Sequence, residues 1–92
     1  MNKIKNIKIY QKSEKMKDVI GADFELGDGE NIHIKDMTIS QDAKEMQNVT
    51  GLSINANGKQ SARLQGVEIK QPSRYLKISD DSNGKVIINK QN

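Results

Sequence analysis

The apolar positions of this chain recur as one triplet, which is written five times at intervals of 15 residues. The triplets are Ile4, Ile7 and Ile9; Val19, Ala22 and Phe24; Ile34, Met37 and Ile39; Val49, Leu52 and Ile54; and Leu64, Val67 and Ile69. Apolar and polar residues alternate around them, as in Met37-Thr38-Ile39, and a period of two is typical of a β-strand. The pattern predicts an all-β protein of five units of about 15 residues, folded as a single domain over residues 1–92.

A bend is predicted inside each unit, because the spacing of three within every triplet breaks the alternation once. The residue before the second apolar position is Asn6, Gly21, Asp36, Gly51 and Gly66 in the five units. Asn, Asp and Gly are the residue types that best tolerate positive φ. We therefore expect positive φ at these five positions, with a corner or bulge that returns the next side chain to the core.

A second, 30-residue period is superimposed on the first. It relates Gln11, Gln41 and Gln71, then Ser13, Ala43 and Ser73, and then Met16, Met46 and Leu76. Turn signals alternate in the same way: Gly27-Asp28-Gly29 and Asn57-Gly58 are tight-turn sequences, whereas the connections expected at 10–15, 40–45 and 70–74 are polar without Gly. Two units together are therefore predicted to be duplicated, with Val86-Ile87-Ile88 as an irregular last strand.

Two architectures fit these patterns. In a short β-solenoid, residues 15 apart lie above one another and form columns such as Ile4, Val19, Ile34, Val49 and Leu64. In an antiparallel meander curled into a barrel or sandwich, a turn near residue 28 pairs Val19 with Met37, Ala22 with Ile34, and Phe24 with Ile32. We favour the solenoid because the units are alike and aromatic residues are few, although its open end then needs a partner to cover it.

Composition indicates a thin core, since 34% of the residues are hydrophobic and 3% are aromatic. A second copy of the chain could complete the burial. The absence of Cys excludes disulfides, thiolate metal sites and a Cys nucleophile, and it favours a reducing compartment. We find neither a signal peptide nor an apolar run of the roughly 18 residues that span a membrane, so a cytoplasmic protein without membrane contact is expected.

No catalytic, cofactor, metal or small-molecule substrate site is predicted. His33 is the only histidine, alternates out of phase with Ile32 and Ile34, and has no second ligand or placed carboxylate nearby in the sequence. The Ser and Thr hydroxyls therefore lack a base. We expect that the protein is not an enzyme.

Charge is unevenly distributed, although the net charge is only +3. A lysine row crowds the first unit and consists of Lys3, Lys5, Lys8, Lys12, Lys15 and Lys17. These lysines either pair with acids of the next unit, such as Asp23 and Glu25, or form a surface for an anionic partner. The two arginines and few aromatics disfavour direct nucleic-acid binding, which stays as the alternative function.

The expected function is that of a protein-binding or self-assembling β-repeat protein, acting as a structural subunit or as a protein inhibitor. Its edge strand or flat face would then meet a protein partner or another copy of the chain. The small size, the Lys-, Ile- and Asn-rich composition and the lack of catalytic residues also suit a product of a phage or other mobile element.

Overall fold

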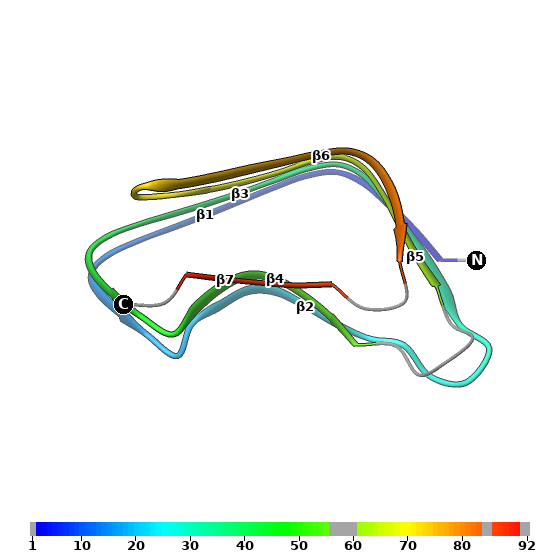
Figure 1. Ribbon diagram of the computed structural model, residues 1–92, viewed down its shortest axis with the longest axis horizontal. Coiled ribbons are helices and arrows are strands. Elements are labelled where there is room, and N and C mark those ends of the chain that lie inside the picture. Colours follow the sequence, from blue (N-terminus) through cyan, green and yellow to red (C-terminus); the bar gives the residue numbers. More distant parts are fainter. Residues whose placement is uncertain (1, 56–60, 84–85, 91–92) are drawn as a thin grey trace.

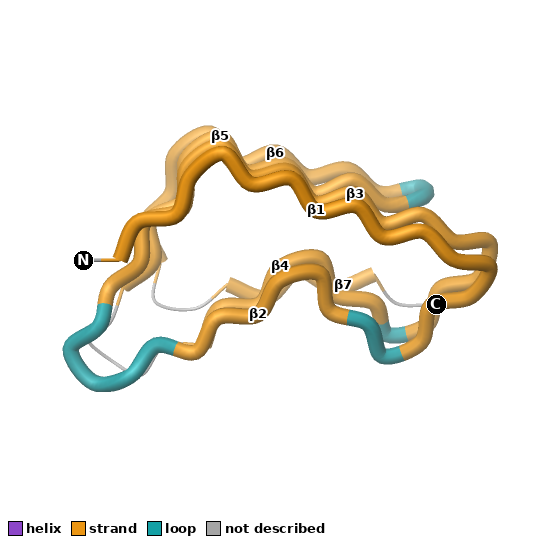
Figure 2. The backbone as a smooth tube through the Cα atoms, turned by 180° about the vertical axis from the view of Figure 1, so that it is seen from behind, coloured by secondary structure: helices purple, strands orange, loops and turns teal. Residues whose placement is uncertain are grey.

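The computed structural model describes residues 2–55, 61–83 and 86–90. All regular secondary structure in these residues consists of β-strands. The strands are β1 (Asn2–Lys17), β2 (Ile20–Glu25), β3 (Asn31–Gln47), β4 (Val49–Asn55), β5 (Ser61–Gln71), β6 (Arg74–Asn83) and β7 (Val86–Lys90). They form one sheet in the order β1-β3-β5-β6 and a second in the order β2-β4-β7. The two sheets face each other, joined by connections at both ends (Figures 1 and 2). The all-β prediction is thereby confirmed.

Strands β1, β3 and β5 run parallel, as do β2 and β4, and each neighbour in these series is one 30-residue period further along the chain. Ile4 lies opposite Ile34 and Ile34 opposite Leu64, while Phe24 lies opposite Ile54. The expected columns of residues 15 apart are therefore wrong, because a step of 15 crosses to the other sheet. The meander pairings are wrong as well, since β2 pairs in parallel with β4 and not antiparallel with β3.

The 15-residue repeat has a physical basis all the same, because the second and third residues of every triplet, in both sheets, pack in one main core. The first residues of the second-sheet triplets, Val19 and Val49, pack in a second, smaller cluster. The main cluster contains Ile34, Met37 and Ile39 of β3 together with Leu52 and Ile54 of β4. Successive triplets therefore meet the same apolar surroundings from opposite sides. We call β1 with β2 the first layer and β3 with β4 the second layer.

The chain changes sheets at Asp18 and Asn48 rather than at the connections expected over 10–15 and 40–45, which lie inside the continuous strands β1 and β3. Asp18 and Asn48 have φ values of 56° and 52°, in the left-handed region that Asn and Asp tolerate. The Asn48 Nδ2 donates to Asp18 Oδ1 at 2.8 Å, which joins the two corners. Beside them Met16 and Met46, in register, belong to a second, smaller core cluster.

The five predicted bend positions divide between two roles. In the first sheet Asn6, Asp36 and Gly66 have φ values of 60°, 57° and 60°. In the second sheet Gly21 and Gly51 lie outside the left-handed region, so the expectation of positive φ is wrong there. Their side-chain position is instead filled by neighbours: a Cβ on Gly21 would lie 2.6 Å from the Gly51 carbonyl oxygen, and one on Gly51 would overlap Ile69 Cγ2.

A ladder of three glutamines crosses the first sheet on the side that faces the second. Gln41 Nε2 donates to Gln11 Oε1 at 2.9 Å and to the Thr50 carbonyl oxygen at 3.0 Å. Gln71 Nε2 donates to Gln41 Oε1 at 2.8 Å. Gln41 is only 2% exposed, so this ladder satisfies polar groups that water cannot reach.

The 30-residue period ends after β5. Pro72 and Ser73 form a turn, with Ser73 at φ 64°, and β6 returns antiparallel to β5 so that Leu76 lies opposite Ile69. The last strand, β7, pairs antiparallel with β4. Of the predicted tight turns, Gly27-Asp28-Gly29 connects β2 with β3, whereas Asn57-Gly58 lies outside the described residues.

Candidate interaction surface

Strands β1 and β2 form an open edge at one end of the molecule. Each is the terminal strand of its sheet and pairs on one side only within the described part of the chain. Both lie at the front of Figure 2, where the first layer can be followed from β1 through the corner into β2. The unpaired side of β1 runs along 16 residues. Such an edge presents unpaired backbone N–H and C=O groups to which another strand can add.

Apolar side chains of the first layer lack the cover that the second layer has. Ile34 and Ile39 are each 0% exposed, whereas their first-layer equivalents Ile4 and Ile9 are only partly buried. Ile20 on β2 is 46% exposed, and the residue opposite it in the second layer is the polar Thr50. The open edge therefore displays a row of aliphatic surface beside its free backbone groups.

The lysine row lies along β1, and the structure divides it into two halves. In the C-terminal half, Lys12 lies opposite Asp42 and Lys15 opposite Glu45, with Lys15 Nζ 3.5 Å from Glu45 Oε2. A third pair has the charges reversed, with the acid on β1 and the base on β3: Lys44 Nζ lies 3.5 Å from Glu14 Oε2. These exposed pairs are each worth about 0–1 kcal/mol, and they favour the observed 30-residue register.

In the N-terminal half, Lys3, Lys5 and Lys8 lie opposite His33, Lys35 and Thr38. None of the three lysines forms an ion pair within the described residues. The expected pairing with Asp23 and Glu25 is wrong, because those acids lie on β2 in the other sheet. Glu25 Oε1 instead accepts a hydrogen bond from Asn55 Nδ2 at 2.8 Å.

The second half of the first layer carries the opposite charge. Residues 2–17 hold six lysines and one glutamate, a formal charge of +5. Residues 18–30 hold five acids and no base, a formal charge of −5. These acids are Asp18, Asp23, Glu25, Asp28 and Glu30. The open edge is therefore basic along one sheet and acidic along the other.

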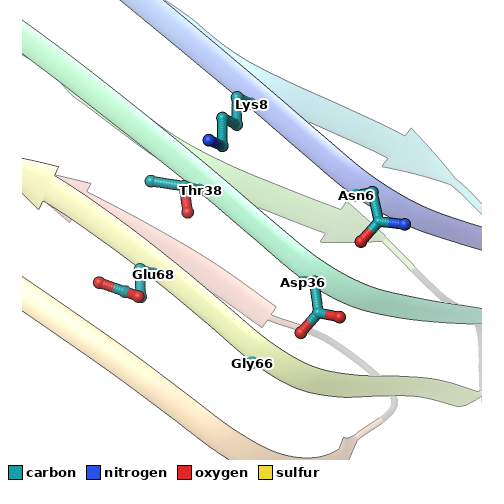
Figure 3. Close-up of a pocket in the computed structure, with 6 residues that line it drawn as sticks. All are labelled: Asn6, Lys8, Asp36, Thr38, Gly66 and Glu68. Atoms are coloured by element: carbon teal, nitrogen blue, oxygen red, sulfur yellow. The ribbon is translucent and has the colours of Figure 1, made fainter.

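A shallow hollow of about 400 Å³ lies on the outer face of the first sheet, lined by Asn6, Lys8, Asp36, Thr38, Gly66 and Glu68 (Figure 3). It follows from the backbone bend, because the residues at positive φ on three neighbouring strands lie side by side there. Asp36 Oδ1 occupies the space beside Gly66, where a Cβ would lie 2.7 Å from it. The lining offers one ammonium and two carboxylates but no histidine to act with them.

His33 lies on the same sheet, and its Nε2 donates to the side-chain oxygen of Gln65 on β5. No group of three or more His, Asp or Glu side chains in the described ranges could hold a metal ion. The described segments also contain no helix with the length and hydropathy needed to cross a membrane.

Comparison with protein-family models, with curated proteins and with solved structures finds no match.

Two features of the open edge were not predicted from the sequence. Asp42 and Glu45 are the acids that face the lysine row, and their 30-residue offset from Lys12 and Lys15 was a readable signal. Exposed Ile20 carried a weaker signal, because the residue 30 positions later is a threonine.

Proposed function

We propose that this chain is a non-enzymatic binding protein that docks through its open edge, either onto another protein or onto a second copy of itself. In this proposal the molecule is a short β-solenoid in which each turn comprises two of the repeated units. The open edge is the end of that solenoid, where a further turn would stack.

The observation that supports this function is the difference in burial between the first two layers. Completely burying an aliphatic side chain contributes about 1.5–3 kcal/mol. Ile4, Ile7 and Ile9 are only partly buried, and so have part of that free energy still to gain from a strand added to β1. Backbone hydrogen bonds along the edge would fix the orientation of the added strand, and pockets between side chains would select it.

The test compares one variant at the open edge with one at the opposite end. Ile20→Lys places a charge on the exposed edge of β2, and such charges block strand addition. Tyr75→Lys is the matched control, because Tyr75 is similarly exposed, at 58%, on β6. We expect the unmodified chain and Tyr75→Lys to self-associate or to capture the same partner, measured by sedimentation and by affinity capture with mass spectrometry. Ile20→Lys should do neither.

A different result is expected if the lysines of β1 prevent strand addition by charge repulsion. The unmodified chain would then sediment as a monomer at all protein and salt concentrations, and it would capture nothing that Ile20→Lys does not. That outcome would refute docking through the open edge. Replacing the lysines by glutamine would in that case create association rather than remove it.

Nucleic-acid binding is the second candidate, and one contact favours it: Lys5 and Lys35 lie opposite each other as like charges. Such a pair is destabilising in the free protein and would be relieved by phosphate. If phosphates bind there, affinity should fall steeply with salt, and Lys5→Gln with Lys8→Gln should reduce the log–log salt slope by about two. We expect no micromolar binding at physiological salt, because Tyr10 is the only aromatic residue on β1.

A further inference from the structure

We propose that two copies of this chain associate through their open edges, so that β1 of each copy pairs antiparallel with β2 of the other. The proposal rests on the proposed function and names one occupant for the open edge. It follows from the distribution of charge over the first layer and from the alignment of its two strands.

Charge complementarity selects this arrangement among those that join two copies at this end. Pairing β1 with β1 would bring two strands of formal charge +5 together. Pairing β1 with β2 of the second copy instead places lysines beside acids, and two-fold symmetry produces that contact twice. The interface then joins the basic half of each copy to the acidic half of the other.

The register of the pairing follows from the positions of the two strands within one copy. A Cβ on Gly21 would lie 2.8 Å from Ile39 Cγ2 and 3.3 Å from Gln41 Nε2. Because residues 30 apart are in register, Gly21 is level along the strand direction with Ile9 and Gln11. Since β1 and β2 run in opposite directions, this alignment sets Asp23 level with Lys8, and Glu25 level with the bend at Asn6, next to Lys5.

A two-fold axis between the sheets and parallel to the strands leaves every residue at the same level along the strands. It exchanges the two sheets and keeps outward side chains outward. Lys8 of one copy therefore comes beside Asp23 of the other. Glu25 comes beside the bend at Asn6, where Lys5 is the nearest cation. On the inner side Ile9 comes beside Ala22 and Ile7 beside Phe24, which continues both apolar rows across the interface.

Stacking of the open edge on the far end of another copy is disfavoured by the strand count. Among the residues that the structure describes, one sheet has four strands and the other has three. With a strand spacing of about 4.8 Å, the far edges of the two sheets do not end at one height. A copy approaching there cannot pair both β1 and β2 at once, so the association closes as a dimer.

Cross-linking tests the register directly, because the chain has no cysteine. In the variant Lys8→Cys with Asp23→Cys, the two thiols of one copy point outward from opposite sheets and cannot meet. In the dimer they lie on adjacent strands, within the Cα separation of about 4.4–6.8 Å that a disulfide needs. Mild oxidation should give a covalent dimer. The control Lys12→Cys with Asp23→Cys, four residues away from that register, should give little.

Charge reversal provides the second test, by sedimentation equilibrium. Lys5→Glu with Lys8→Glu should weaken the dimer on the order of a hundredfold, since four favourable pairs become repulsive. Asp23→Lys with Glu25→Lys should weaken it equally, and all four changes on one chain should restore it. Lys77→Glu on β6 is the control at the far end and should leave the dimer unchanged.

A monomer at all concentrations, or a dimer indifferent to Asp23→Lys with Glu25→Lys, would overturn this arrangement. The proposed function would then still be decided by partner capture with the unmodified chain and Ile20→Lys. Equal cross-linking of the two cysteine pairs would also refute the register, even if a dimer forms.

Discussion

Replacing the central member of the glutamine ladder is expected to destabilise the fold far more than replacing the end member. Gln41 makes three side-chain hydrogen bonds, with Gln11, Gln71 and the Thr50 carbonyl oxygen. Gln41→Met keeps the volume and removes all three. Each lost bond costs about 0.5–1.5 kcal/mol, and an unsatisfied buried amide costs about 1–3 kcal/mol.

The amide left without a partner is that of Gln71, which is itself buried and whose Oε1 already lacks a partner within the described residues. Met gains some apolar burial in return. We therefore expect Gln41→Met to lower the free energy of unfolding by about 2–4 kcal/mol. For a domain of this size that is a fall in Tm of roughly 10–30 °C.

Gln11→Met is the matched control, because it removes one bond and leaves Gln41 Nε2 bonded to Thr50. Its cost should be about 0.5–1.5 kcal/mol. Changing Gln11, Gln41 and Gln71 together to Met should bring the free energy of unfolding back to within about 1 kcal/mol of the original, since no buried side-chain amide is then left unpaired. Urea unfolding followed by circular dichroism measures all three. Equal midpoints for Gln41→Met and Gln11→Met would refute the ladder as a stabilising network.

Gly51→Ala should lower the free energy of unfolding by about 2–3 kcal/mol, because its methyl group would overlap Ile69 Cγ2. Gly29→Ala would meet no atom and should cost only the strain of its φ of 77°, about 1 kcal/mol. Equal thermal midpoints for these two variants would contradict the close packing of the sheets at Gly51. The pKa of Tyr75 is raised because its hydroxyl donates to Glu68 Oε2 at 2.9 Å, with partial desolvation of the hydroxyl and the negative charge of Glu68 adding to the effect. Tyr75 therefore contributes stability below the unfolded-state pKa of about 10, and this is lost as the pH rises through the higher pKa of the folded state. Glu68→Gln should lower the pKa of Tyr75, measured by phenolate absorbance in a Tyr10→Phe background, and an unchanged value would exclude the contact as the cause.

The apolar pattern predicted the strands and their buried positions but not which strands are neighbours. Ile7 and Ala22 share a period because they face one core from opposite sheets. Hydrophobic burial is non-directional, so the apolar pattern reports a residue's surroundings rather than its contacts. Directional contacts carried the missing information. Gln11 with Gln41, and Lys15 with Glu45, are each one 30-residue period apart and both bonded across one ladder.

The bend positions carry a similar lesson. In the first sheet they are Asn6, Asp36 and Gly66, where positive φ admits side chains of the Asn and Asp type. In the second sheet both are glycine, at Gly21 and Gly51, because no room exists for a Cβ. Backbone propensity alone placed all five bend positions in one group. The sequence did contain a signal that separates the two causes: the residue type varies at the first-sheet positions, whereas both second-sheet positions are glycine.

The parallel 30-residue register makes the length of this molecule adjustable in discrete steps. A tandem duplication of residues 31–60 would supply one further strand to each sheet, lengthen the molecule by about 4.8 Å, and add a fourth glutamine to the ladder. A duplication of a single unit, half as long, would send every later strand to the wrong sheet in the reversed direction. The parallel register therefore allows this chain to grow or shrink by 30 residues at a time, and it disallows a change of 15 residues.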